Sequence, residues 1–222
     1  MTGITDDGQA DTPDGSTNTD PAGNAKREQI LKGAGTIFLA DGYEGASMSR
    51  IAQMAGVSKG TLYNHFDGKA SLFSAFFEEQ ARCHMASIEA LSHGSEQSIR
   101  VTLIRFADMT VHLLISPMAL GLHRIIVSEV EKFPHLADTF WRYGFGRTLS
   151  NLTEYLARSV ALGELEIADP SLSAEQFMLM CQARIIQHRR FGLPVDDSDA
   201  AIAEFAAFTA DSFLKIYESR HQ

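Results

Sequence analysis

One short segment of the chain, residues 47–69, gathers side chains that donate hydrogen bonds together with small residues. Its members that could contact a nucleic acid are Ser47, Ser49, Arg50, Lys59, Gly60, Thr61, Tyr63, Asn64, His65 and Lys69. Residues of these types suit contact with phosphate oxygens and with base edges in the major groove. The chemistry indicated by this segment is therefore recognition of double-stranded DNA.

Two short helices are expected to position these side chains. Ser47 is a good N-cap for a helix over Met48–Ala55, and Ser58 is a good N-cap for a helix over Lys59–His65. Gly56 begins the turn between them. Helix, tight turn and helix is the layout of a helix-turn-helix unit, whose second helix enters the major groove.

The second helix of this unit divides into a packing face and a contact face. Leu62 and Phe66, four residues apart, are expected to face inward and anchor the helix. Tyr63, Lys69 and Ser47 suit phosphate oxygens, although Tyr63 could instead pack against the first helix. The candidates for base edges are Lys59, Thr61, Asn64 and His65. Asn64 and His65 could equally have structural roles.

The charge of the whole chain at first argues against a nucleic-acid partner. The 222 residues have a formal net charge of -9, with 45% hydrophobic and 21% charged residues. Residues 25–72, however, hold six Lys and Arg against four Asp and Glu, whereas residues 1–24 hold five Asp and no base. Residues 73–222 hold 13 bases against 19 acids. The composition thus predicts a mildly basic segment joined to an acidic remainder.

Several other classes of function are disfavoured. The chain has no HExxH and no phosphate-binding glycine-rich loop, so no catalytic residue is proposed and an enzyme is not expected. Cys83 and Cys181 form neither a disulfide framework nor a zinc pattern, and Cys83 and His84 would point about 100° apart on a helix. We therefore expect no metal site and no cofactor.

The expected setting is the cytoplasm. Two isolated cysteines fit a reducing compartment, and the N-terminus does not resemble a secretory signal. No segment approaches the roughly 20 apolar residues of a membrane span.

The rest of the chain reads as helical, with apolar residues at helical spacing and no sustained alternation typical of strands. Helices are expected over residues 25–41, 69–91, 96–115, 118–132, 134–162 with a weak spot at Gly144 and Gly146, 173–188 and 199–217. The fold class is therefore all-α, with about nine helices in total. Residues 1–24 are expected to be a disordered acidic tail, residues 25–72 a helix-turn-helix DNA-binding domain and residues 73–222 a helical effector-binding and dimerisation domain.

The stretch from Ser49 to Phe66, followed by Lys69 and Leu72-Phe73 and preceded by Gly42-Tyr43, resembles the N-terminal domain of TetR-family transcriptional regulators. The likeness covers about residues 25–77. It implies that Tyr63, Lys69 and Ser47 contact backbone phosphates. It also implies a two-fold dimer that binds operator DNA.

The second half of the chain resembles the AefR-like C-terminal domain found within that family. The likeness rests on residues 123–136, Phe140, Tyr143-Gly144, residues 163–165, Asp169-Pro170 and residues 174–177. It implies a repressor of an efflux system or a neighbouring metabolic operon. A small-molecule effector would bind among the helices of this domain.

Candidate side chains for the effector pocket mix aromatic and flexible apolar groups with a few polar tips. They are Met109, His112, Met118, His123, Trp141, Tyr143 and Phe145. Each of them could instead belong to the core.

The last two expected helices are the candidates for the dimer interface, because both are apolar over more than one narrow stripe. The residues concerned are Phe177, Met178, Met180, Cys181 and Ile185 on one helix and Phe205, Phe208, Phe213 and Ile216 on the other. Some of these side chains could simply fill the core.

The function expected from the sequence is a ligand-responsive DNA-binding transcriptional regulator, a repressor released from its operator by a small-molecule effector. Two alternatives remain open. The effector could control an activator, or the chain could be a helical small-molecule-binding module without a role at DNA.

Overall fold

The structure, a computed structural model, describes residues 21–93 and 98–217, with side chains described over residues 23–82 and 98–217. Its helices are α1 (Pro21–Gly45), α2 (Met48–Met54), α3 (Lys59–His65), α4 (Lys69–His93), α5 (Ile99–Leu114), α6 (Pro117–Glu129), α7 (His135–Phe140), the π-helical turn η1 (Trp141–Phe145), α8 (Gly146–Ala161), α9 (Pro170–Cys181), α10 (Ile185–Arg190) and α11 (Asp199–Tyr217). Within these two ranges there is no strand, which confirms the all-α prediction.

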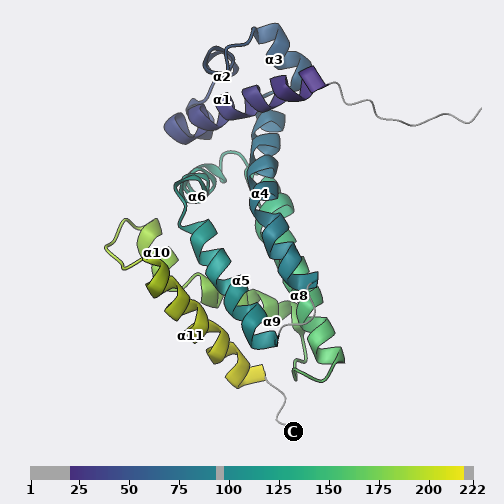
Figure 1. Cartoon of the computed structure of the whole chain (residues 1–222). Helices are drawn as coiled ribbons and strands as arrows, with labels where there is room; N and C mark the ends of the chain where they lie inside the picture. The colour runs from purple at the N-terminus through teal and green to yellow at the C-terminus, as the bar shows by residue number, and fades with distance from the viewer. Residues whose placement is uncertain (1–20, 94–97, 218–222) are drawn as a thin grey trace, which may run out of the picture.

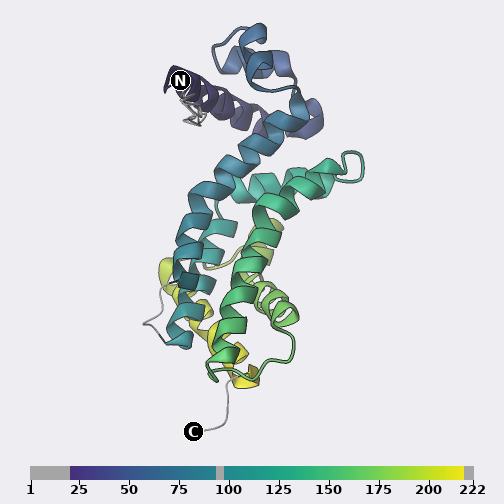
Figure 2. The same ribbon diagram turned by 90° about the vertical axis from the view of Figure 1, so that its right-hand side faces the viewer.

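The molecule is elongated, with α1–α3 at one end (Figure 1). We refer to α1–α3 as the head and to α5–α11 as the body. Helix α4 begins in the head and runs down the length of the body (Figures 1 and 2). Because one helix of 25 residues belongs to both parts, a displacement in the body can be transmitted directly to the head.

The core of the head continues into the body. Phe38 of α1 packs edge-on against Phe73 of α4, with ring centroids 5.0 Å apart. The same cluster of buried side chains includes Leu122 and Ile126 of α6 and Leu136 of α7. The head is therefore held by apolar contacts to α6 and α7 as well as by α4.

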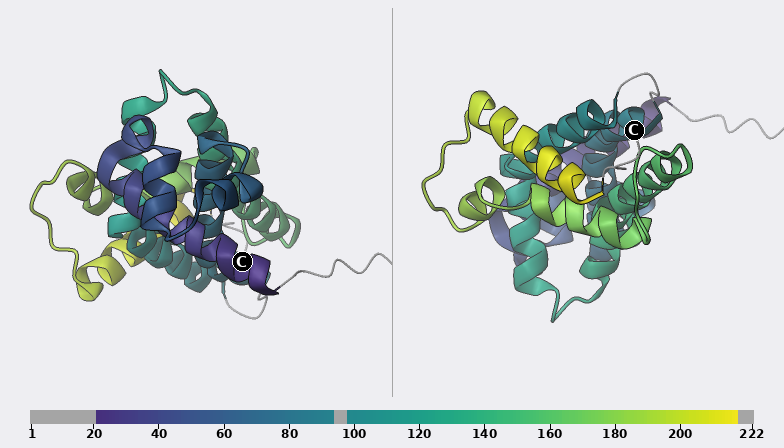
Figure 3. Two further views of the ribbon diagram at one scale, coloured as in Figure 1. Left: turned by 90° about the horizontal axis from the view of Figure 1, so that it is seen from above. Right: turned by 90° about the horizontal axis from the view of Figure 1, so that it is seen from below.

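A second core cluster lies at the far end of the body. Phe177 of α9 packs against Phe106 of α5 and Phe213 of α11, with centroid distances of 5.9 Å and 5.0 Å. Helix α11 lies along α5 in Figure 1, and α9 and α11 lie next to each other when the molecule is seen from below (Figure 3, right). These contacts hold α5, α9 and α11 together.

Helix α1 differs from the expected one at both ends. It begins at Pro21 rather than near Ala25, so the last residues of the expected tail are helical, and the remainder of that tail, residues 1–20, lies outside the described residues. Proline at the start of a helix is favoured because its φ is already helical. At the other end, Gly42 has φ 74°, and a short further turn reaches Gly45.

The expected helix over residues 134–162 is divided. The stretch from His135 to Ala161 is helical throughout, but Trp141–Phe145 forms a π turn at the expected weak spot. A Cβ on Gly146 would lie 2.7 Å from the carbonyl oxygen of Trp141. The absence of a side chain at Gly146 therefore permits the widened turn.

The expected single helix over residues 173–188 is wrong, because the structure shows two helices. Asp169 caps α9 through its carboxylate, which accepts hydrogen bonds from the amides of Ser171 and Leu172, so α9 begins earlier than expected. The chain breaks at Arg184, whose φ is 51°. After the break Ile185 and Ile186 of α10 are buried in a third small cluster with Val111 and Ile202. The gain from burying both isoleucines explains a break that the local sequence does not signal.

No single helix in the described ranges has the length and apolarity to cross a membrane. Helices α5 and α6 are long and apolar enough for a membrane span only when taken together, and the two helices are bent by 71° relative to each other.

Candidate functional site

The two short helices of the head begin where serine side chains cap them. The hydroxyl of Ser47 accepts a hydrogen bond from the amide of Arg50 at 3.2 Å, and that of Ser58 accepts one from the amide of Thr61 at 3.0 Å. The hydroxyls of Ser58 and Thr61 also lie 2.8 Å apart. Both caps were predicted, and the observed α2 and α3 match the expected ranges closely.

Helix α3 buries one face and leaves the other to solvent. Leu62 and Phe66 are buried, as predicted. The exposed side is formed by Lys59, Gly60, Tyr63 and Asn64, while Thr61 and His65 are half-buried. The candidate contact residues of α3 therefore lie together on or at the edge of one accessible surface.

Helix α2 contributes further polar groups next to this surface. Ser47 and Ser49 are exposed. Arg50 is exposed as well, and its guanidinium forms an ion pair with Asp41 at the end of α1. The Asp41 carboxylate orients Arg50 and offsets part of its charge.

Lys69 is placed differently from the other candidates. Its ammonium donates hydrogen bonds to the carbonyl oxygens of Glu44 and Ala46, each at 3.0 Å, and lies 4.7 Å from the centre of the Tyr43 ring. These bonds hold the connection between α1 and α2 against the first turn of α4. Lys69 thus has a structural role in addition to any phosphate contact.

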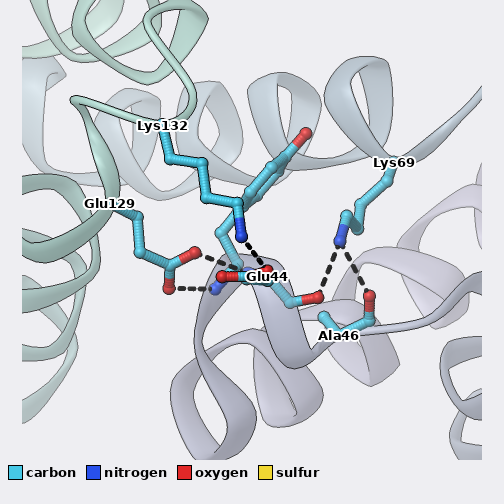
Figure 4. A network of polar contacts seen from close by, with 6 residues as sticks. Glu44, Ala46, Lys69, Glu129 and Lys132 are labelled. Atoms are coloured by element: carbon cyan, nitrogen blue, oxygen red, sulfur yellow. Dashed lines mark hydrogen bonds and ion pairs between the residues drawn. The ribbon is translucent and has the colours of Figure 1, made fainter.

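A polar network joins this connection to the body (Figure 4). The two carboxylate oxygens of Glu129, at the end of α6, accept hydrogen bonds from the backbone amides of Tyr43 and Glu44 at 2.7 Å and 2.5 Å. Lys132 forms an ion pair with the side chain of Glu44. The role of Glu129 could not be recognised from the sequence, because its partners are backbone amides 85 and 86 residues away.

Tyr43 is surrounded by this network. Its hydroxyl lies 2.8 Å from Nε2 of His135. Burial and the nearby Glu129 carboxylate raise the pKa of the Tyr43 hydroxyl above its ordinary value. The ring is neutral at physiological pH and acts as a packing element between the head and α7.

The body contains a cavity of about 130 Å³. Its lining comes from α4 to α10, including η1, and from residues beside these helices, and is mostly apolar: Phe77, Gln80, Ala81, Thr110, Leu113, Leu114, Ser116, Met118, Ala119, Leu122, His123, Ile126, Phe140, Gly144, Phe145, Thr148, Met178, Gln182 and Arg190. A mostly apolar cavity with a few polar groups is the usual form of a small-molecule site.

The structure brings together only part of the expected pocket. Met118, His123 and Phe145 line the cavity. The other four do not. Trp141 is largely exposed and His112 lies on the surface 3.8 Å from Asp108, while Met109 packs against the second core cluster and Tyr143 against the first.

Two polar residues of the cavity lining could not be recognised from the sequence. Thr110 and Arg190 were not singled out, because nothing in the local sequence shows that α5 and α10 face the same space. His123 lies near Arg190, and burial together with the Arg190 charge holds the pKa of His123 below its ordinary value.

Cys181 takes no part in this site. Cys181 is buried in the second core cluster, and burial raises the pKa of its thiol well above the ordinary value, so it is unreactive. The side chains of Cys83 and His84 lie outside the described residues.

The apolar side chains of the last helices also divide between core and surface. Of the residues expected at a dimer interface, Phe177, Met178, Cys181, Ile185 and Phe213 are buried within the chain, and Met180 and Phe205 are partly buried. Phe208 and Ile216 of α11 are 70% and 67% exposed. On α9, Leu172 and Leu179 are also exposed, although they were not among the expected residues.

A two-helix unit with a polar outer face, carried on a helical body with an internal cavity, defines a helix-turn-helix protein of the regulator class. The family model described as bacterial regulatory proteins, tetR family, matches residues 30–76. The model described as AefR-like transcriptional repressor, C-terminal domain, matches residues 101–219, which is more than half of the chain. The chain belongs to the TetR family, and this confirms both resemblances seen in the sequence.

Solved structures of the family share the whole fold. A putative TetR-family transcriptional regulator from Mesorhizobium loti is 25% identical, with a TM-score of 0.80, and the match covers 90% of this chain and 100% of that one. The flavonoid-responsive regulator FrrA is 30% identical, with a TM-score of 0.76, and the match covers 89% of this chain and 99% of that one.

The first curated relatives match over a limited part of the chain. The transcriptional repressor AcnR of Corynebacterium diphtheriae is 40% identical over 65 residues, which are 29% of this chain and 34% of that protein. The chain spans about a third of the length of the first such relatives. These relatives and the family are regulators of transcription and not enzymes.

Proposed function

We propose that this protein is a ligand-responsive, DNA-binding transcriptional regulator that works in the cytoplasm, as a repressor released from its operator by a small molecule. The observation that carries the proposal is that helix α3 has one buried face and one exposed polar face. Leu62 and Phe66 anchor it, while Lys59, Tyr63 and Asn64 face solvent together. A short helix held in this way, with donors on its free face, suits the major groove.

The contacts divide between the backbone and the bases of the DNA. Tyr63 and the hydroxyl of Ser47 reach phosphates, since a serine hydroxyl that accepts a capping bond can still donate one. The Lys69 ammonium has three N–H donors, of which two bond to the carbonyl oxygens of Glu44 and Ala46. The third donor reaches a phosphate. Ser49 and Arg50 lie beside them on α2. The base contacts come from α3, through Lys59, Thr61, Asn64 and His65, with Gly60 allowing close approach.

A two-fold dimer would place two heads on one face of the DNA, with the recognition helices about 34–36 Å apart. Exposed apolar side chains on α9 and α11 support a four-helix interface: Leu172, Leu179, Phe208 and Ile216. Such side chains are costly to leave in water and rarely cluster without a partner. Residues 25–72 then act as the DNA-binding domain and residues 73–222 as the effector-binding and dimerisation domain.

Two helices connect the cavity to the head. Helix α4 lines the cavity with Phe77 and carries Lys69 at its first turn. Helix α6 lines it with Met118 and His123 and ends at Glu129, which holds the backbone of the head. A ligand that favours another position of α6 or α4 would move the head and change the spacing of the two recognition helices.

A gel-shift assay with the DNA upstream of the protein's own gene tests the proposal. Wild-type protein should retard this DNA, and affinity should fall as salt rises, with a slope of about -0.9 per neutralised phosphate. Tyr63→Ala and Lys59→Ala should weaken binding by about tenfold each, since a charged or bidentate contact contributes about 1–3 kcal/mol. Arg142→Ala is the matched control, because Arg142 is exposed in the body.

Retention of specific binding by Tyr63→Ala and Lys59→Ala together would rule out α3 as the recognition helix. If neither the wild-type protein nor any variant retards the DNA, the result would favour the alternative of a ligand-binding module without a role at DNA.

An activator is the second candidate. The transcriptional activator FasR of Mycolicibacterium smegmatis is 36% identical over 77 residues, which are 32% of that protein. A reporter fused to the upstream region separates the two outputs. Deletion of the gene should raise expression for a repressor and lower it for an activator.

A further inference from the structure

The lining of the cavity includes two hydrogen-bonding groups without partners. Thr110 Oγ1 and Arg190 Nε are buried, and no described residue accepts from or donates to either atom. Both residues line the cavity, one from α5 and the other from α10. Buried polar atoms without partners cost free energy and are uncommon in native proteins. The two atoms therefore mark a place where a ligand can contribute the missing acceptor.

The lining of the cavity also carries uncompensated positive charge. Arg190 is half-buried, and no described carboxylate pairs with it, whereas the adjacent Arg189 pairs with Asp197 at 3.4 Å. Among the described residues that line the cavity, His123 and Arg190 are the ionisable ones. Burial lowers the pKa of Arg190 from its ordinary value, which reflects the cost of holding this charge without a partner.

Most of the remaining lining is apolar. Phe77, Leu122, Phe140, Phe145 and Met178 contribute aromatic and flexible aliphatic surface. The volume of about 130 Å³ is close to that of cavities, of about 150 Å³, that hold a single benzene ring. A ligand of this size presents about one ring or a short branched chain.

We propose that the cavity binds a compact apolar organic acid, with its carboxylate against Arg190 and Thr110 and its apolar part among the aromatic side chains. The inference rests on the proposed function, in which this cavity is the effector site. A carboxylate accepts from the guanidinium Nε–H and from the threonine hydroxyl, and so satisfies both buried atoms and the charge. A neutral ligand would leave the charge uncompensated, and a cation would be repelled by it.

Matched pairs of ligands test the charge directly. Binding of benzoate, phenylacetate, 3-phenylpropionate and hexanoate to the full chain is measured by calorimetry at pH 7.5 and compared with binding of benzyl alcohol, 2-phenylethanol, 3-phenylpropanol and hexanol. At least one acid should bind about tenfold or more tightly than its alcohol, because hydrogen bonds to charged groups contribute about 1.5–3 kcal/mol. Failure of every acid to exceed its alcohol overturns the inference.

Substitutions locate the site. Arg190→Gln should abolish the preference for the acid, and Arg190→Lys, which keeps the charge but loses the planar donor, should retain part of it. Arg189→Gln removes the same charge from the same helix outside the cavity and should leave the preference unchanged. A preference that survives in folded Arg190→Gln, or that Arg189→Gln removes, places the anion elsewhere and overturns the inference.

If Arg190→Gln fails to fold, two other measurements take its place. The first is the acid preference of Arg190→Lys, and the second is the signal of Arg190 Nε–H in the ¹⁵N spectrum of the wild-type protein. That signal should shift on addition of the best acid and stay in place on addition of its alcohol. An unmoved signal at saturating acid overturns the inference.

The gel-shift assay on the upstream DNA separates this inference from the proposed function. If the protein binds the DNA specifically but shows no preference for any acid, the proposed regulator function is supported and the organic-acid ligand is overturned. If acid binding depends on Arg190 but the protein binds no DNA, the organic-acid site is supported and the proposed regulator function is overturned.

Discussion

Glu129 at the end of α6 accepts a hydrogen bond from the backbone amide of Tyr43 at 2.7 Å, across 86 residues of sequence. Its second oxygen accepts from the amide of Glu44 at 2.5 Å. One carboxylate thus satisfies two amides just after the interruption of α1 at Gly42, and it ties the head to a helix that lines the cavity. The contact is a specific polar link between the body and the head.

Replacing this carboxylate should weaken the link. Glu129→Gln keeps the size of the side chain, but its amide nitrogen is a donor and would face an amide that also donates. We expect a loss of about 1–3 kcal/mol in the free energy of unfolding, measured by urea denaturation. Glu131→Gln, at an exposed neighbouring position, is the control and should change stability by less than about 0.5 kcal/mol. Equal effects of the two substitutions would show that the contact is not important for stability.

Gly42 is required for two separate reasons, and three alanine variants can separate them. Its φ is 74°, and a Cβ there would lie 2.5 Å from Oε1 of Glu129. Gly163 has a φ of 76° with nothing within 4 Å, and Gly68 has open space without a positive φ. Gly163→Ala should cost about 1–2 kcal/mol from backbone strain alone, Gly68→Ala little, and Gly42→Ala more than Gly163→Ala. Thermal unfolding of the three variants checks this order, which fails if Gly42→Ala and Gly163→Ala are equally stable.

The proposed dimer should depend on the exposed face of α11. Phe208 is 70% exposed within one chain, so a charge there is harmless to the monomer but would be buried at the interface. Phe208→Glu should convert a dimer of about twice 24.4 kDa into a monomer in analytical ultracentrifugation, and should weaken operator binding with it. Val127→Glu introduces the same charge at a 64% exposed site on α6 and should leave the dimer intact. A dimer that persists in Phe208→Glu would place the interface elsewhere.

His123 should make the stability of the ligand-free protein depend on pH. Burial and the Arg190 charge lower its pKa in the folded protein below the ordinary 6.5, so between these two values the unfolded chain binds more protons than the folded one. Stability should therefore fall as the pH is lowered below about 6.5 and level off below the folded pKa. His123→Gln should flatten this part of the curve when the free energy of unfolding is measured from pH 7.5 to 5, and an unchanged slope would contradict the expectation.

Local sequence was sufficient for the helix-turn-helix unit and for the class of the protein. Ser47 and Ser58 cap their helices through hydrogen bonds within three residues, and Leu62 and Phe66 share a face because they are four residues apart. Such short-range geometry does not depend on the rest of the fold. The family pattern of residues 49–66 could be seen for the same reason.

The cavity and the link to the head were decided by tertiary structure. Met118, His123 and Phe145 were named from the sequence, but Thr110 joins them from α5, and Arg190 joins them from α10, which follows the turn at Arg184 and buries Ile185 and Ile186. Glu129 likewise finds backbone amides, which have no residue type to reveal them. Apolar periodicity shows that a face is buried but not what it is buried against, so Phe177 of α9 and Phe213 of α11 proved to be core. The sequence by itself determined most of the helices, the exposed face of α3 and the family. Packing between helices distant in sequence decided where the cavity lies and which charged group it encloses.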